Sequence, residues 1–377
     1  MIPPLLRTGL LAGARPRKSG EDPLRYENSE ETALPPVRLA ILGAGLIGRR
    51  HAAHVAGQPS TALVAVVDPS PGAQEVAAAH GVRWFPAFAD LVAADKPDGV
   101  IIATPNRLHV ENGLEAVAAG IPALVEKPIA DDVAAATRLV EAAEAAGVPL
   151  LVGHHRRHNP VMRRAQEIVA SGRLGRILAV QATCWFFKPD DYFAPAWRRE
   201  AGAGPVLVNL IHDVDNLRAL CGEVASVQAL QSNAVRGHAV EDTAGILLRF
   251  ASGAIATLSV SDAVVAPYSW EFTSGENPAY TRTQEACYLI GGTHGSLAVP
   301  TLDLWHNAAA RSWWEPLLRE RTPTDEADPL GLQVAQFARV IRGEEPPLVS
   351  GREGLATLKV IEAVKASAAT GRSVTIG

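Results

Sequence analysis

Cysteine is scarce in this sequence, and neither sign of charge dominates it. The three cysteines, Cys184, Cys221 and Cys287, are too few and too widely spaced to predict a disulfide framework or a zinc site. We therefore expect a reducing, cytoplasmic environment. Lys and Arg number 35 against 40 Asp and Glu, so the net charge of −5 gives no electrostatic basis for binding nucleic acid or an anionic membrane. No apolar run reaches the ~18 residues that a membrane-spanning helix requires.

What is present favours a folded protein of two domains. The chain has 377 residues, of which 47% are hydrophobic, enough for a sizeable core. Residues 1–36 differ from the rest, because they are rich in Pro, Gly, Arg and Glu and show no sustained apolar period. We predict that residues 1–36 are a disordered extension. They do not have the pattern of a secretory signal, and the four basic residues before Glu21 leave a transit peptide as the alternative.

From Val37 onward, short apolar runs alternate with Ala-rich segments of helical period. This alternation is typical of βαβ units, whose parallel strands are buried on both faces. We predict an α/β, doubly wound Rossmann domain over residues 37–153. Its predicted strands are Val37–Leu42, Leu63–Val67, Gly99–Ile102, Ala123–Val125 and Leu150–Val152.

Residues 154–377 have a different texture and are predicted to form a second, α+β domain. A linking helix at Asn159–Ser171 and a strand at Arg176–Phe187 precede a helix at Pro205–Leu220. Later β-rich segments follow one another closely enough to pair antiparallel, and Ala251-Ser252-Gly253 is placed as a hairpin turn. Those segments are Ala225–Leu230, Thr243–Phe250, Gly253–Val260, Ala286–Ile290 and Ser296–Val299, and the closing helices are Leu332–Arg342 and Gly351–Ala369.

A G-x-G-x-x-G turn lies where the first strand passes into a helix. Such a turn brings the helix N-terminus against a dinucleotide diphosphate. The next strand ends in Asp68, whose carboxylate is placed to accept hydrogen bonds from an adenine-ribose diol. No Arg or Lys accompanies Asp68 to compensate a 2′-phosphate, so we predict NAD rather than NADP. The residues of the turn that we expect at the cofactor are Gly43, Gly45, Leu46, Ile47 and Gly48.

Three further motifs follow later strands of the first domain. They are Ala103-Thr104-Pro105-Asn106-Arg107-Leu108-His109, Glu126-Lys127-Pro128, and Gly153-His154-His155-Arg156-Arg157-His158-Asn159-Pro160. Together they resemble the Gfo/Idh/MocA family of glucose-fructose oxidoreductase and inositol dehydrogenase, from about Val37 to the C-terminus. The resemblance implies a second domain with a large, mostly antiparallel open sheet that forms homodimers or homotetramers. It also implies NAD(P)-dependent transfer of hydride to or from a secondary alcohol of a sugar, cyclitol or sugar acid.

The resemblance assigns roles to individual residues. Thr104, Pro105, Asn106, His109 and Glu126 become expected cofactor contacts. It implies a cis peptide bond between Lys127 and Pro128, and it places the Lys127 ammonium where it stabilises a developing alkoxide.

His212 is the predicted general acid/base, because the ordinary pKa of imidazole suits proton exchange near neutral pH. Family members commonly carry an acidic residue four positions earlier, where this chain has Val208. Asp215 and Asn216 lie three and four residues after His212 on the same helix face, so either is a candidate to orient the ring. Asn209 is an expected substrate contact.

A basic and aromatic set of residues is predicted to bind the substrate. Arginine suits bidentate recognition of a carboxylate, although Trp, Tyr and Arg are equally typical of subunit contacts. The set comprises Arg156, Arg157, Tyr192, Trp197 and Arg198, with Asp215 beside it. The segment Trp305–Trp314 is expected in the core or in an interface. His154, His155 and His158 have no acid or cysteine at ligand spacing, so no metal site is predicted.

Two other functions remain open at this point. One is a dihydrodiol dehydrogenase of aromatic catabolism, in which the arginines hold a carboxylate. The other is a non-catalytic protein that senses NAD(P).

Overall fold

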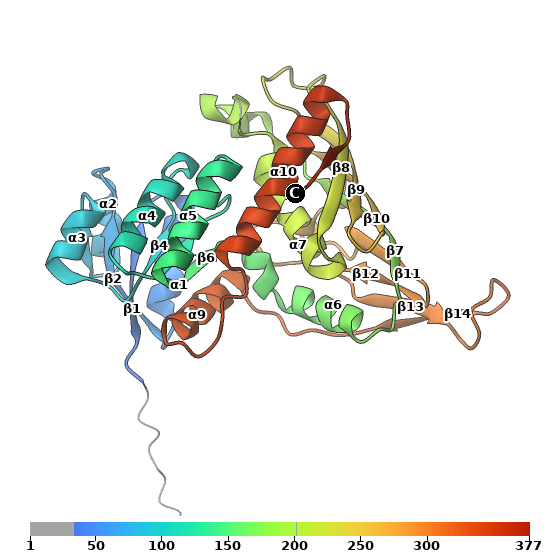
Figure 1. Ribbon diagram of the computed structural model, residues 1–377, viewed down its shortest axis with the longest axis horizontal. Helices are drawn as coiled ribbons and strands as arrows, with labels where there is room; N and C mark the ends of the chain where they lie inside the picture. The colour runs from blue at the N-terminus through green and yellow to red at the C-terminus, as the bar shows by residue number, and fades with distance from the viewer. Residues whose placement is uncertain (1–33, 201) are drawn as a thin grey trace, which may run out of the picture. The chain divides into compact units, whose positions relative to one another are not determined.

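A six-stranded parallel sheet is built from the first apolar runs of the chain (Figure 1). The computed structural model describes residues 34–200 and 202–377. The strand order is β3-β2-β1-β4-β5-β6, the doubly wound order in which ligands bind at the carboxyl ends of the strands. The strands are β1 (Val37–Leu42), β2 (Thr61–Val67), β3 (Arg83–Phe85), β4 (Gly99–Ile102), β5 (Ala123–Val125) and β6 (Leu150–Val152).

Helices with Ala-rich apolar stripes cover this sheet. In α5, for example, Ala136, Leu139, Val140 and Ala143 recur at helical spacing and are buried, while Asp132 caps the first turn by accepting from the Ala135 N–H. The helices are α1 (Leu46–Gly57), α2 (Ala73–Ala79), α3 (Phe88–Asp95), α4 (His109–Ala118) and α5 (Val133–Ala146), with a 3₁₀ turn η1 (Asn106–Leu108) before α4.

A nine-stranded sheet follows, in the order β14-β13-β12-β11-β7-β10-β9-β8-β15. Its pairs are antiparallel except β7 with β10, which run parallel. The strands are β7 (Ile177–Trp185), β8 (Val224–Ser232), β9 (Thr243–Phe250), β10 (Ile255–Ser261), β11 (Tyr288–Gly292), β12 (Gly295–Val299), β13 (Asp303–Asn307), β14 (Leu317–Arg321) and β15 (Val374–Thr375).

Helices α6, α7 and α10 cover one face of the large sheet, and α9 returns to pack on α1 (Figure 1). The longest, α10, packs along β8 and also contacts α5 and α7. The remaining helices are η2 (His155–His158), α6 (Pro160–Ala170), η3 (Asp190–Phe193), η4 (Ala196–Arg199), the π-helical turn η5 (Val206–Leu210), α7 (Ile211–Cys221), α8 (Trp270–Thr273), α9 (Pro329–Ile341) and α10 (Gly351–Thr370).

The predicted fold class is confirmed, with differences at the level of elements. The parallel sheet, the antiparallel hairpin at Ala251-Ser252-Gly253 and both closing helices are present. The prediction missed β3 and α3, and it also missed the β13–β14 hairpin, whose connecting loop holds the end of the Trp-rich segment. Trp313 and Trp314 are 89% and 84% exposed at the end of that hairpin, which excludes the core for both and leaves the interface alternative of the prediction.

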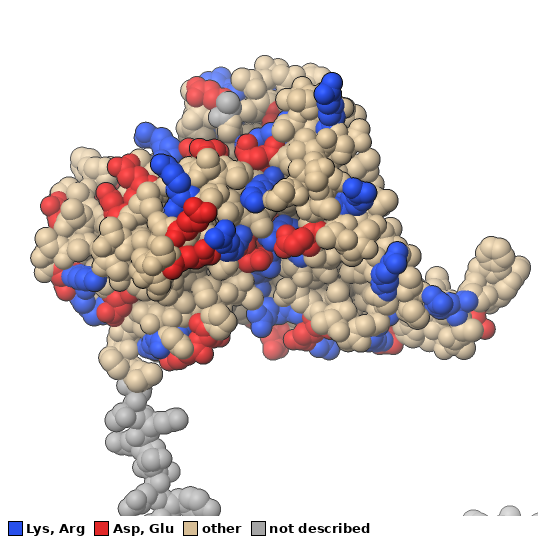
Figure 2. Space-filling view, in the orientation of Figure 1, with Lys and Arg blue, Asp and Glu red and all other residues tan. Residues whose placement is uncertain are grey.

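The predicted disordered extension, residues 1–36, lies outside the described residues except for residues 34–36. In the described part of the chain, no helix combines the length and apolar character needed to cross a membrane. Basic and acidic side chains are interspersed on the face shown in Figure 2. That face therefore offers no extended region of a single charge sign.

Candidate active site

The glycine-rich turn between β1 and α1 is shaped for a ligand at the helix N-terminus. Gly43 has a φ of 95°, and a Cβ there would lie 2.5 Å from the Ala103 carbonyl oxygen. A Cβ on Gly48 would lie 1.9 Å from the Gly43 oxygen, whereas one on Gly45 would meet nothing within 4 Å. The first turn of α1 has no side-chain cap and no acidic residue, and Leu46 is 85% exposed. The unpaired N–H groups thus face open space, which fits a diphosphate.

Asp68 lies directly beside this turn. Its Oδ2 accepts from the Ala44 N–H at 2.8 Å, and its Oδ1 accepts from the N–H and hydroxyl of Ser70. Burial opposes ionisation, but these hydrogen bonds outweigh it and lower the pKa of Asp68. Asp68 is therefore a fixed carboxylate at the carboxyl end of β2, with lone pairs left for a ribose diol.

The loop after β4 is held in place by His109, which differs from expectation. One ring nitrogen of His109 lies 2.7 Å from the Pro128 carbonyl oxygen, and the other lies 2.8 Å from that of Thr104. Its ring thus joins the loops after β4 and β5, and both of its nitrogens are already engaged by protein. The Thr104 hydroxyl donates to Asn112, while Pro105 and Asn106 begin the 3₁₀ turn η1 at the sheet edge.

Glu126 follows β5 and is paired with a residue that sequence reasoning missed. The buried ring of His51, on α1, lies with Nε2 2.6 Å from Glu126 Oε1. Burial opposes ionisation of Glu126, but the hydrogen bond and charge of His51 lower its pKa to about 2. The other carboxylate oxygen accepts from the Lys127 N–H at 3.1 Å. The sequence feature that could have identified His51 is its position one turn after Gly48, the last glycine of G-x-G-x-x-G.

The Lys127 ammonium is directed at the π-helical turn η5. The peptide bond to Pro128 is cis, and Nζ donates to the Val208 carbonyl oxygen at 3.1 Å. Position 208 therefore supplies a main-chain acceptor where the family commonly has a carboxylate. Burial lowers the pKa of Lys127 to about 8, although the negative charge of Glu126 opposes the change. π-helical turns inside helices are frequent at functional sites.

His212 lies buried in the first turn of α7, surrounded by other imidazoles. Its ring centroid is 5.3 Å from that of His155 and 6.1 Å from that of His154, in edge-on arrangements. Burial, together with the positive charge of Lys127, holds the pKa of His212 well below its ordinary value. His212 is therefore a neutral imidazole at pH 7. Its Nδ1 is buried without a hydrogen-bond partner in the described chain.

Arg156 is neutralised by several carboxylates rather than left free for a ligand. Its guanidinium donates to Glu271 at 2.8 Å and lies 3.5 Å from Asp213 and 3.7 Å from Glu276. Burial raises the pKa of Asp213 to about 6, against the opposing charge of Arg156. His155 contacts Glu276 at 3.1 Å. Glu271 and Glu276, on and just after α8, carry no recognisable sequence signal.

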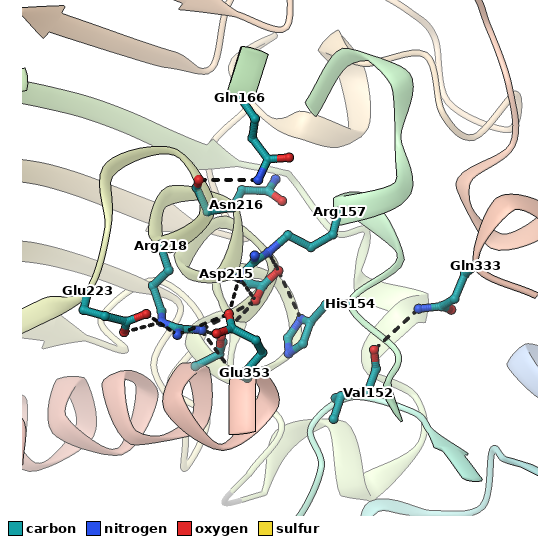
Figure 3. A network of polar contacts seen from close by, with 12 residues as sticks. Val152, His154, Arg157, Gln166, Asp215, Asn216, Arg218, Glu223, Gln333 and Glu353 are labelled. Atoms are coloured by element: carbon teal, nitrogen blue, oxygen red, sulfur yellow. Dashed lines mark hydrogen bonds and ion pairs between the residues drawn. The ribbon is translucent and has the colours of Figure 1, made fainter. Parts of the chain in front are cut away.

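Asp215 and Arg157 bind each other, which corrects two expectations (Figure 3). Asp215 accepts from Arg157 Nε at 2.7 Å and Nη2 at 2.9 Å, and also from the Thr357 hydroxyl. Arg157 also reaches Glu353, so its charge is already matched. Asp215 therefore does not orient His212, and Arg157 is part of a buried ion-pair network instead of a free ligand-binding group.

Two asparagines expected at the site, Asn216 in α7 and Asn209 in η5, differ in their hydrogen bonding. Asn216 donates to the Tyr288 hydroxyl at 3.1 Å, so it too is engaged away from His212. Asn209, in η5, is buried, and its Oδ1 has no hydrogen-bond partner within the described residues. An unsatisfied buried amide oxygen is costly unless a ligand donates to it, so Asn209 remains suited to a substrate hydroxyl.

The segment after β7 holds the remaining predicted residues. The Arg198 guanidinium lies 4.1 Å from the Tyr192 ring centroid and donates to the Tyr192 carbonyl, so these two residues stabilise each other. Trp197 is exposed. Across residues 34–200 and 202–377, no group of three His, Cys, Asp or Glu side chains is arranged to hold a metal ion.

Comparisons with known proteins show which family the chain belongs to. Residues 37–154 match the family described as "Oxidoreductase family, NAD-binding Rossmann fold", and residues 162–298 match the "GFO/IDH/MocA C-terminal domain". The 1,5-anhydro-D-fructose reductase of Ensifer adhaerens is 32% identical over 301 residues, which are 76% of this chain and 82% of that protein. The chain belongs to the Gfo/Idh/MocA family. It is an oxidoreductase with an NAD-binding Rossmann domain, and the expected family, fold and cofactor are confirmed.

Other members of the Gfo/Idh/MocA family align over nearly the whole chain. An inositol 2-dehydrogenase of Rhizobium meliloti is 28% identical over 90% of this chain and 99% of its own length. The WlbA dehydrogenase of Bordetella pertussis, solved in complex with NADH and UDP-GlcNAcA, is 27% identical with a TM-score of 0.73, covering 91% of this chain and 99% of that one. Both are full-length similarities and not matches to one domain.

Proposed function

We propose that this protein is an NAD-dependent dehydrogenase that transfers hydride between nicotinamide and a secondary alcohol of a sugar, cyclitol or sugar acid. The observation that carries the proposal is the meeting of Lys127, from the end of β5, with the η5–α7 segment that holds His212. The related inositol dehydrogenase, anhydrofructose reductase and WlbA support the substrate class.

The cofactor residues form one edge of the parallel sheet. The turn at Gly43, Gly45 and Gly48 would hold the diphosphate on the N-terminus of α1, and Asp68 would hold the ribose. Thr104, Pro105, Asn106 and Glu126 would line the nicotinamide side. A cofactor held by these residues would supply the hydride acceptor for the carbon that bears the alcohol.

Lys127 would stabilise the charge that develops in the reaction, and His212 would transfer the proton. As the C–H bond breaks, the alcohol oxygen develops negative charge and becomes a carbonyl, and the Lys127 ammonium would stabilise that charge. His212, neutral at pH 7, would take the hydroxyl proton. In the reverse reduction, His212 would return that proton from its protonated form, which its lowered pKa keeps scarce at pH 7. The unpartnered oxygen of Asn209 would accept from a neighbouring hydroxyl.

We further propose a division into a cofactor domain at 37–153 and a substrate and oligomerisation domain at 154–377, after an extension at 1–36. Exposed apolar side chains on the strands of the large sheet, such as Leu230, Leu247, Ile255 and Leu289, support assembly into a homodimer or homotetramer. Light scattering at micromolar concentration tests this. A reducing, cytoplasmic location fits the three buried, unpaired cysteines.

Replacing Lys127 by Ala tests the proposed reaction. NADH affinity, measured by calorimetry, should be unchanged, while turnover of NAD with a panel of inositols, aldoses, sugar acids and cis-dihydrodiols should fall by roughly 10²–10³-fold. Lys96→Ala, at an exposed lysine, is the matched control. Unchanged turnover in Lys127→Ala would contradict the assignment. Tight NADH binding without turnover of any panel member by the wild type would favour a cofactor sensor.

A further inference from the structure

Lys188 is a buried lysine whose ammonium is left without a hydrogen bond. It follows β7, is only 4% exposed, and its Nζ has no hydrogen-bond partner among the described residues. The nearest carboxylate oxygen, on Asp262, is 3.8 Å away, beyond hydrogen-bond distance. Buried charges are ordinarily paired and hydrogen-bonded, because an unsatisfied one is costly. A ligand that accepts hydrogen bonds would supply the partner that this ammonium lacks.

The counter-ion nearest to Lys188 is already used by another cation. Asp262 Oδ1 accepts from Arg236 Nε at 2.8 Å, and Arg236 also lies 3.5 Å from the exposed Asp190 carboxylate. The Tyr192 ring lies under the ammonium, with its centroid at 5.0 Å, and supplies only a weak interaction. Burial lowers the pKa of Lys188, and Asp262 opposes that change. Within the described residues, the Lys188 ammonium therefore has no carboxylate at hydrogen-bond distance.

The main chain of Lys188 is nevertheless fixed on both sides. Its N–H donates to the Asp262 carbonyl at 2.9 Å, and its own carbonyl accepts from Arg236 Nη2 at 2.7 Å. A rigid main chain that presents an unbonded ammonium is preorganised for a ligand, since little order is lost on binding.

Lys188 is also electrostatically linked to the proposed reaction site. Its positive charge is among those that lower the pKa of Lys127, and both lysines are influenced by Glu271. Of the arginines first expected to hold a carboxylate, Arg156 is engaged by Glu271, Arg157 by Asp215, and Arg198 by the Tyr192 carbonyl. Two cations lower the pKa of Lys127, Arg156 and Lys188, and of these two only the Lys188 side chain makes no hydrogen bond within the described residues.

We propose that Lys188 binds the carboxylate of the substrate, which makes the substrate a sugar acid rather than a neutral sugar or cyclitol. This inference rests on the proposed function and narrows it. A carboxylate supplies the hydrogen-bond acceptor that the ammonium lacks, and the opposite charges strengthen that hydrogen bond. Binding of a uronic-acid nucleotide sugar by the related WlbA is consistent with this class.

Matched pairs of ligands that differ only in the carboxylate test the proposal. We would measure binding of D-glucuronate against D-glucose, and D-galacturonate against D-galactose, to the NADH complex by calorimetry, and NAD turnover with the same compounds. The wild type should bind at least one acid more tightly than its neutral partner. Lys188→Met should weaken that binding by about 10- to 100-fold, as expected for a lost charge-assisted hydrogen bond. Binding of the neutral sugar should change by less than about threefold on the same scale.

Two controls separate ligand binding from a structural role. Lys96→Met removes an exposed lysine and should leave the acid preference intact. Lys188→Arg keeps the positive charge and should retain the acid preference that Lys188→Met loses, whereas a lysine with a purely structural role would give the same result in both variants. An absent acid preference in the wild type, or equal losses for acid and neutral ligands in Lys188→Met, overturns the proposal. Selective acid binding without turnover would leave Lys188 as the carboxylate site and overturn the dehydrogenase assignment instead.

Discussion

The protonation state of Lys127 should set the alkaline limit of the reaction. Burial lowers its pKa from 10.5 to about 8, a difference that corresponds to ~3 kcal/mol against the ammonium form. If the ammonium stabilises the alkoxide, then kcat/KM for alcohol oxidation should be level below pH 8. Above that pH it should fall about tenfold per pH unit, as the amine loses its proton. His212 stays neutral over this range, so it should add no second limb near pH 6.5.

Initial rates of NADH formation between pH 6 and pH 10 measure this limb directly. An NMR titration of ¹³C-labelled lysine side chains gives the pKa of Lys127 independently of any substrate, with Lys127→Ala to assign the signal. Lys127→Arg keeps a cation whose own pKa exceeds 12, so the limb should disappear from its profile even where its rate is lower. Persistence of the limb near pH 8 in Lys127→Arg, or a titration of Lys127 near 10.5 in the wild type, would refute the reasoning.

Three further predictions concern the framework of the site. Gly45→Ala should fold normally, because its Cβ meets nothing within 4 Å, yet it should weaken NADH binding in calorimetry by on the order of tenfold or more. Gly48→Ala places a Cβ 1.9 Å from a main-chain oxygen, so this variant should also have a lower thermal unfolding midpoint. Equal NADH affinity in Gly45→Ala and the wild type would count against a diphosphate there. Burial lowers the pKa of His154 to about 4, so between pH 6.5 and pH 4 the unfolded chain binds more protons than the folded chain. The free energy of unfolding should therefore fall by up to ~3 kcal/mol as the pH is lowered through that window. Urea unfolding at each pH measures this slope, which His154→Gln should flatten. A slope unchanged in that variant would contradict the assignment. Arg157→Met leaves the Asp215 charge buried and should lower the free energy of unfolding by about 3–5 kcal/mol, with KM little changed. A raised KM in a variant of unchanged stability would instead show that Arg157 contacts the substrate.

The parallel domain was predictable because its central strands are buried on both faces. Val37–Leu42, Gly99–Ile102 and Ala123–Val125 form continuous apolar runs, and their predicted bounds agree with β1, β4 and β5. The short strand β3 was missed because Arg83–Phe85 is three residues long, with an exposed arginine at its start. The β13–β14 hairpin was missed because β14 is exposed along its whole length and shows no burial pattern.

The site was predictable only where a motif sits at the end of a strand. The turn at Gly43 and the Glu126-Lys127-Pro128 tripeptide are local in sequence, so their places followed from the strands before them. The partners of Arg156 and Arg157 were not predictable, since Glu271 and Glu353 come from distant helices that only the folded chain brings near. Helical spacing placed Asp215 near His212, but it could not show which neighbour its carboxylate would bind.

The acceptor for the Lys127 ammonium belongs to the peptide backbone of η5, and this has a consequence for how the site tolerates change. No substitution at position 208 deletes that oxygen, so a scan of side chains would pass over it without a signal. What can displace it is a change in the winding of residues 206–210, for example an insertion or deletion in that turn. Among relatives, the number of residues between the positions of Gly204 and His212 should therefore vary less than the identity of residue 208.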